Sequence, residues 1–145
     1  MKVYENDFCR IIWDEANAFM YVKWQDNNVW HKDESEYRKY FELYVQQVEH
    51  YQAINVVHDM LEARYTISLE NQAWTVNEMF PRLVKAGLKR VSLLVSSEFI
   101  TNLSVEQVIT DAENSGIVFE TRYFTNKQDS IDWMLGEETK VIIKW

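Results

Sequence analysis

Residues 74–95 read WTVNEMFPRLVKAGLKRVSLLV, a helical pattern followed at once by a strand pattern. Apolar side chains recur at helical spacing at Val76, Phe80, Leu83 and Val84. Gly87 stands where a helix C-terminus is expected, and residues 91–95 form the nearly unbroken apolar run of a strand that is buried on both faces. A helix that leads through a glycine into a buried strand is typical of α/β proteins with parallel strands.

A proline interrupts this helical pattern. Pro81 has no N–H to donate, and its ring collides with the preceding turn of an α-helix. We therefore expect the helix that begins at Ser68 to kink or split near Phe80.

The same two patterns recur on both sides of this stretch. Strand patterns lie at residues 8–13, 18–24, 54–57 and 117–124, with a last strand or docked tail at 141–143. Helical patterns lie at residues 37–48, 104–112 and 126–135. A short polar turn separates the first two strands, which predicts an antiparallel hairpin at one edge of the sheet.

The order of these elements predicts one α/β domain that spans residues 1–145. Because helices alternate with strands after the hairpin, we expect right-handed crossovers and a mixed sheet. Its parallel interior strands are expected at residues 54–57, 91–95 and 117–124, and about four helices are expected to cover it. A chain of this length can bury a core without disulfides or metals.

Composition and charge argue against several classes of protein. A net charge of −8 without a local cluster of Lys and Arg predicts no nucleic-acid partner. No apolar run is long enough for an integral membrane segment, and the charged residues 1–10 do not resemble a signal peptide, so we expect a cytoplasmic protein. The single cysteine, Cys9, is expected to be a small buried strand residue rather than a reactive thiol.

Three segments resemble a known family: residues 74–91, the tripeptide SVE at 104–106 and the pentapeptide SGIVF at 115–119. They look like the STAS-like (SpoIIAA-like, STAS/SEC14-type) family of small bacterial domains, most of which are uncharacterised. The resemblance covers residues 8–135. It implies a SpoIIAA-like β-α superhelix and a regulatory role, and it carries no catalytic signature.

The resemblance also implies a candidate phosphorylation site. Anti-sigma-factor antagonists of this family are phosphorylated on a Ser or Thr at the start of the helix after the third strand, where Ser68, or Thr66 beside it, stands here. This chain departs from the family pattern, because residues 69–71 read LEN instead of a small, glycine-containing stretch. The alternative role of Ser68 is that of a helix N-cap.

No motif in the chain specifies a reaction. The common hydrolase, phosphate-loop, metalloprotease and paired-cysteine patterns are missing from the sequence, and we predict no metal and no cofactor. Weak catalytic candidates stand at strand ends, where open α/β sheets bind ligands: His58, Asp59 and Ser97. Together they could supply a general base and a nucleophile; alternatively, Asp59 and Ser97 satisfy turns and helix caps.

Aromatic residues make up 14% of the chain, with six Trp and eight Tyr, more than a core of this size obviously needs. A candidate binding surface lies near the hairpin and the first helix, at Trp24, Trp30, Tyr37, Tyr40 and Tyr44. Such side chains suit a homodimer face, a groove for a partner or a pocket for an apolar ligand. They also suit the simpler role of packing one helix onto the sheet.

We therefore expect a non-enzymatic regulatory or binding module of STAS-like type. It would act through protein–protein contacts, as a homodimer or with a regulatory protein, or through a small apolar ligand. The alternative is a small enzyme that uses His58, Asp59 and Ser97. The enzyme requires these three side chains to converge, whereas a ligand-binding module requires an apolar cavity of about several hundred Å³.

Overall fold

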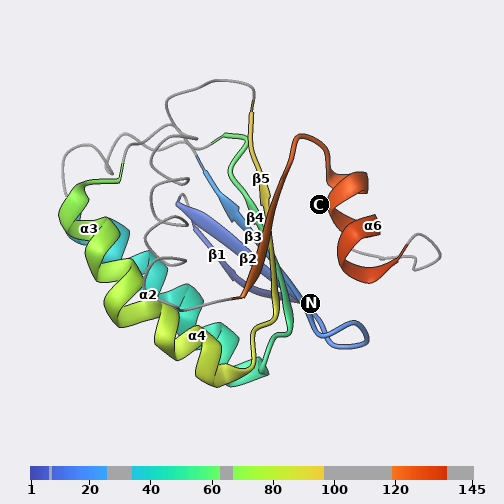
Figure 1. The fold of residues 1–145 in the computed structure, drawn as a ribbon, viewed down its shortest axis with the longest axis horizontal. Helices are drawn as coiled ribbons and strands as arrows, with labels where there is room; N and C mark the ends of the chain where they lie inside the picture. Colours follow the sequence, from blue (N-terminus) through green and yellow to red (C-terminus); the bar gives the residue numbers. More distant parts are fainter. Residues whose placement is uncertain (7, 26–33, 63–66, 97–118, 137–145) are drawn as a thin grey trace.

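A six-stranded sheet organises the computed structural model, which describes residues 1–6, 8–25, 34–62, 67–96 and 119–136 (Figure 1). The strands are β1 (Lys2–Glu5), β2 (Cys9–Asp14), β3 (Phe19–Trp24), β4 (Asn55–Asp59), β5 (Arg90–Leu94) and β6 (Glu120–Phe124). They lie side by side in chain order. β1, β2 and β3 pair antiparallel, whereas β3, β4, β5 and β6 pair parallel, so the sheet is mixed as predicted.

The predicted hairpin is confirmed in β2 and β3. Its turn is held by the carboxylate of Asp14, which accepts hydrogen bonds from Ala16 N at 3.1 Å and Asn17 Nδ2 at 2.8 Å. Ala18 has a left-handed backbone with φ 48°, which completes the reversal. Six consecutive residue pairs, from Cys9↔Trp24 to Asp14↔Phe19, then fix the register.

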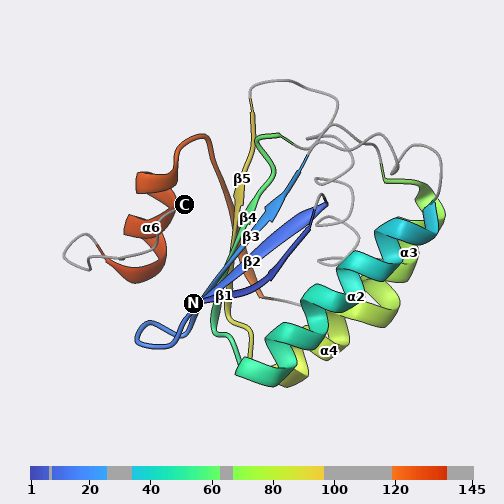
Figure 2. The same cartoon turned by 180° about the vertical axis from the view of Figure 1, so that it is seen from behind.

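Helices cover both faces of this sheet (Figures 1 and 2). α2 (Glu34–Tyr51) connects β3 to β4, and α3 (Leu69–Trp74), η1 (Thr75–Met79) and α4 (Phe80–Ala86) connect β4 to β5. Parallel strands in chain order joined by right-handed crossovers carry their connecting helices on one face, which is where α2, α3 and α4 lie. α6 (Lys127–Leu135) covers the opposite face beside β5 and β6.

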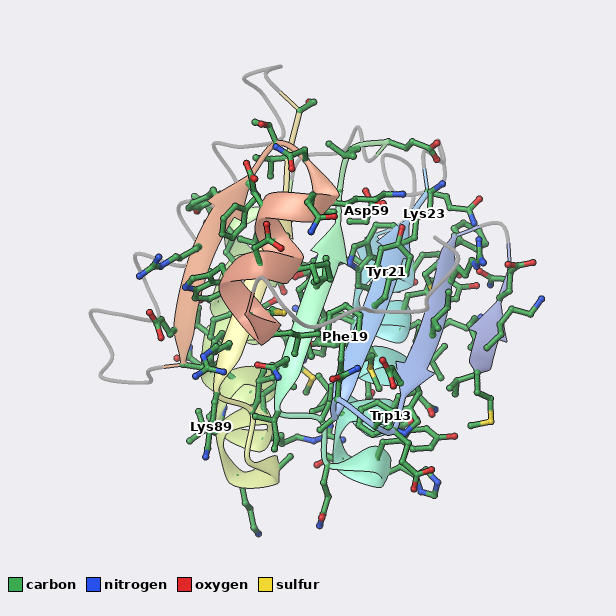
Figure 3. All side chains as sticks on the ribbon, turned by 90° about the vertical axis from the view of Figure 1, so that its right-hand side faces the viewer. Trp13, Phe19, Tyr21, Lys23, Asp59 and Lys89 are labelled. Atoms are coloured by element: carbon green, nitrogen blue, oxygen red, sulfur yellow. The ribbon has the colours of Figure 1, made fainter. Side chains whose placement is uncertain are left out.

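Each strand therefore contributes to two separate cores. Alternate side chains of a strand point to opposite faces, so Met20, Val22 and Val56 pack under α2 and α4. Phe19, Tyr21 and Val57 instead face the α6 side, together with Ile131 and Met134 of α6. Figure 3 looks onto this second face, where Phe19 and Tyr21 point out of the sheet. β4 is buried at all five positions, because both of its faces are covered.

The predicted interruption of the second helix is confirmed, and the structure gives its form. The N–H of Phe80 donates to the carbonyl of Thr75, five residues earlier, at the end of the π-helical η1. α4 then begins at Phe80, so Pro81 lies in its first turn. Backbone N–H groups in the first turn of an α-helix donate no intrahelical hydrogen bond, so the N–H that proline lacks is not needed there. The wide turn thus accommodates the proline without ending the helix.

The predicted edge of the sheet is wrong. The hairpin was expected at the edge, but β1, a strand that we did not predict, pairs with β2 and lies outside it. β6 was expected inside the sheet; among the described strands it is the last in the order, and two of its five residues are half-buried and three exposed. The predicted helix at 104–112 and the last strand at 141–143 lie outside the described residues. None of the helices in the described ranges could cross a lipid bilayer.

Replacement of Gly87 by alanine tests how α4 ends. Gly87 has φ 98°, a left-handed conformation that costs an L side chain energy, although an added Cβ would meet no atom within 4 Å. We expect Gly87→Ala to lower the free energy of unfolding by about 1 kcal/mol in urea titrations, with an unchanged m-value. The exposed Lys85→Ala in the same turn is the control and should be nearly neutral; equal losses in both variants would contradict the backbone explanation.

Candidate functional site

The two strand-end candidates His58 and Asp59 do not meet. They are consecutive residues of β4, so their side chains leave opposite faces of the sheet. His58 contacts Trp24 and Tyr44 on the side of α2. Asp59 contacts Tyr21 on the side of α6, as Figure 3 shows. The convergence that the enzyme hypothesis required is therefore contradicted for this pair, and Ser97 lies outside the described residues.

Asp59 is satisfied by its own neighbourhood. One carboxylate oxygen accepts from the hydroxyl of Tyr21 at 2.5 Å, and the other accepts from the backbone N–H of Leu61 at 3.1 Å, which holds the turn after β4. Burial and the bond to Asp59 raise the pKa of Tyr21. Lys23 lies close by but forms its ion pair with Glu62, 3.4 Å away. The structural role foreseen for Asp59, a turn-forming group, is borne out.

His58 instead lines an apolar cavity of about 80 Å³ between the sheet and the helices. Its aromatic walls come from β3, α2, α4 and the segment before β6: Trp24, Tyr37, Phe41, Tyr44, Phe80 and Phe119. Its aliphatic walls include Met60, Ile67, Leu83, Val91 and Leu93. The polar residues of the lining include His58 and four residues with hydroxyl groups: Tyr37, Tyr44, Thr75 and Thr121. Among the described lining residues there is no carboxylate, lysine or arginine.

The protonation state of His58 follows from its surroundings. Trp24 donates its indole N–H to His58 Nδ1 at 3.0 Å, so the proton of the neutral ring resides on Nε2. Burial lowers the pKa of His58 from 6.5 to about 3. His58 is thus a neutral donor at physiological pH, held in place by the stacked Trp24 ring and the edge-to-face Tyr44 ring, whose centroid lies 4.6 Å away.

Two tyrosines of the cavity differ in how their hydroxyls are bonded. Tyr37 and Thr75 share a hydrogen bond of 2.7 Å, in which Tyr37 donates because Thr75 gives its own proton to the carbonyl of Asn71. The hydroxyl of Tyr44 is fully buried and has no hydrogen-bond partner within the described part of the chain. Burial raises the pKa of both tyrosines, so both stay protonated.

The predicted aromatic surface is not a surface. Trp24, Tyr37, Tyr40 and Tyr44 are all buried, with at most 6% of any of them exposed. Tyr40 stacks on Phe8 and accepts a hydrogen bond from Asn6, so it has a packing role. The other three line the cavity. Trp30, the fifth candidate, lies outside the described residues.

Ser68 is the N-cap of α3. Its Oγ accepts a hydrogen bond from the backbone N–H of Asn71 at 3.1 Å, and its backbone is extended as an N-cap requires. Glu70 follows in the first turn of α3. The structural alternative for Ser68 is therefore confirmed, while its phosphorylation stays a prediction, and Thr66 lies outside the described residues.

Sequence reasoning missed part of the cavity. Phe41, Phe80 and Leu83 lie in the predicted helical patterns and Val91 in a predicted buried strand, which predicts burial but not a hollow beside these residues. Thr75 could have been predicted as a buried polar residue of this region, because it lies next to Val76 on the buried side of a helix. A buried threonine hydroxyl needs a hydrogen-bond partner. Cys9 is buried as expected, and burial raises the pKa of its thiol to about 12.

No protein-family model, no curated protein and no solved structure matches this chain. In the described ranges, no three His, Cys, Asp or Glu side chains group into a candidate metal site. The site must therefore be interpreted from its own geometry.

Substitution of Ser68 tests its capping role. We expect Ser68→Ala to lower the free energy of unfolding by about 1 kcal/mol, because Asn71 N loses its acceptor. Ser68→Asp is the matched control and should retain most of the stability, since its carboxylate can accept the same bond. Urea denaturation measures both. A loss in Ser68→Asp as large as in Ser68→Ala would contradict the assignment, and phosphopeptide mapping that finds a modified Ser68 would restore the family role.

Acid should weaken the fold through His58. Its folded pKa of about 3 lies below its ordinary value of 6.5, so the unfolded chain binds the extra proton between these pH values. Stability is therefore full above pH 6.5 and falls as the pH drops toward 3, by at most about 1.4 kcal/mol per pH unit. We expect the difference in unfolding free energy between wild type and His58→Gln, which keeps an acceptor for Trp24, to shrink on acidification. Parallel pH profiles would contradict this.

Proposed function

We propose that the chain is a non-enzymatic binding module of STAS-like type that holds a small apolar ligand between its sheet and its α2–α4 helix layer. The observation that carries the proposal is the apolar cavity, whose lining includes a neutral histidine and a tyrosine with a buried, unpartnered hydroxyl. A SpoIIAA-like β-α superhelix is part of this proposal. It is supported by the parallel strands in chain order and by the helices that connect them on one face.

The size of the cavity limits the ligand. The cavity, at about 80 Å³, does not meet the requirement of several hundred Å³ that applies to a module for a drug-sized ligand, so only a much smaller ligand can be proposed for it. An engineered apolar cavity of about 150 Å³ holds one benzene molecule. The ligand, or the part of it that enters, is therefore smaller than a benzene ring, such as a short or branched alkyl group.

The chemistry of the cavity supports binding rather than catalysis. An enzyme needs a general base or a nucleophile with a matched proton partner. His58 has one ring nitrogen occupied by Trp24 and a pKa of about 3, which makes it a poor base. The buried carboxylate that follows His58 in β4, that of Asp59, lies on the other face of the sheet and cannot act with His58. A homodimer, a regulatory protein partner and phosphorylation remain predictions from the family resemblance.

Xenon binding and native mass spectrometry test this function. Xenon enters dry apolar cavities, so we expect pressurised xenon to shift the NMR signals of Leu83, Val91 and Leu93 first. Native mass spectrometry of the purified protein should reveal a small co-purifying molecule.

A filled cavity provides the control. Val91→Phe should abolish both signals, whereas Val84→Phe, on the exposed side of α4, should change neither. If Val91→Phe fails to fold, Leu83→Phe replaces it. Xenon shifts scattered over the protein surface, or equal shifts in the filled variant, would refute the proposed function.

A further inference from the structure

We propose that the cavity selects a ligand with a neutral carbonyl oxygen, which accepts hydrogen bonds from the hydroxyl of Tyr44 and from Nε2–H of His58. This inference rests on the proposed function and deepens it, because it names the polar group that the apolar ligand must carry.

The state of the Tyr44 hydroxyl is the first argument. A buried hydroxyl without a partner costs about 1–3 kcal/mol, so proteins rarely leave one unpaired unless a ligand or water completes it. Tyr44 is fully buried, yet its hydroxyl has no partner in the described residues. The nearby Tyr37, on the same face of α2, has its hydroxyl paired with Thr75. The unpaired hydroxyl is therefore not shared by the neighbouring tyrosine of this helix face; elsewhere in the described residues, Asn55 Oδ1 and Gln72 Oε1 are also buried without a partner.

His58 is the second argument. Its Nδ1 accepts from Trp24, so its Nε2 carries a proton and can only donate. Within the part of the chain that the structure describes, that Nε2–H makes no hydrogen bond. The rings of His58 and Tyr44 touch edge to face, with centroids 4.6 Å apart, and both line the cavity. Two donors of adjacent rings can thus serve one acceptor, and Trp24 is the positioning residue that orients the imidazole.

Charge decides which acceptor fits. The described lining supplies no cationic side chain, so a carboxylate or phosphate would enter without a counter-charge, at a large cost in desolvation. An ammonium group would face the donor Nε2–H of His58, and the described lining supplies no carboxylate to balance its charge. A neutral carbonyl accepts two hydrogen bonds with its two lone pairs and carries no charge into the cavity. The class that fits is a short-chain ketone, aldehyde, ester or amide.

A pair of isosteric probes tests the inference. 2-Butanone and 2-methyl-1-butene have nearly the same shape. Where 2-butanone has a carbonyl oxygen, 2-methyl-1-butene has a methylene group. We expect NMR titrations of the whole chain to show an affinity for 2-butanone that is about 3- to 10-fold higher than that for the alkene. This ratio corresponds to the net free energy of about one to two hydrogen bonds. The 13C signal of the bound carbonyl should move downfield, as hydrogen bonding to its oxygen requires.

Two tyrosine variants separate recognition from folding. Tyr44→Phe should remove most of the preference for the ketone and leave or raise the melting temperature, because no hydrogen bond of the described structure is lost. Tyr37→Phe makes the same chemical change in the same cavity but breaks the bond to Thr75, so it should lower the melting temperature and keep the preference.

The outcomes separate this inference from the proposed function. Xenon binding together with equal affinities for the ketone and the alkene would overturn the carbonyl assignment and leave the apolar cavity in place. A preference that survives in Tyr44→Phe would also overturn the assignment, and would indicate a water molecule as the partner of Tyr44. Failure of xenon and of both probes would overturn the proposed function and the inference with it.

Discussion

Burial of β4 on both faces is the constraint on which the rest of this structure depends. Every residue of Asn55–Asp59 is buried, because β3 and β5 flank the strand and helices cover each side. Side chains of one strand alternate between faces, so two neighbours as polar as His58 and Asp59 enter two different cores. Each must find its partners there without the other, and that separation decides what chemistry the domain can perform.

Both cores combine paired buried polar groups with an unpaired one: on the α6 side, the Oδ1 of Asn55 has no hydrogen-bond partner within the described residues. On the α6 side, Tyr21 satisfies Asp59, and Ser92 shares a hydrogen bond of 2.5 Å with Ser130, which joins α6 to β5. On the α2 side, the aromatic groups around the cavity leave the Tyr44 hydroxyl unpaired. On the outer surface of the same layer, Arg82 of α4 donates hydrogen bonds to Glu49 and Glu42 of α2. The bond from Arg82 lowers the pKa of Glu49. In the same helix layer, the buried Oε1 of Gln72 in α3 likewise has no hydrogen-bond partner within the described residues.

Local patterns explain why much of the fold was predictable. The periodicity of α2, the polar turn at Asp14, the caps of Ser68 and Asn126 and the glycine after α4 are all set by residues within a few positions of one another. The positions of the two outer strands among the described residues were not predictable in this way. β1 is four residues long with a mixed burial pattern, and three of the five residues of β6 are exposed, so neither strand has an apolar pattern that indicates its place in the sheet.

The sequence by itself determined the α/β class, the hairpin, the parallel strands β4 and β5, and the interruption before Pro81, because each follows from hydrogen bonding and sterics along the local chain. The tertiary structure alone decided that the aromatic residues of α2 turn inward around a cavity, and that Trp24 fixes the tautomer of a histidine 34 positions away. These facts depend on which strands become neighbours and which face a helix covers. Such relations arise from packing between distant segments, and no spacing within one segment encodes them.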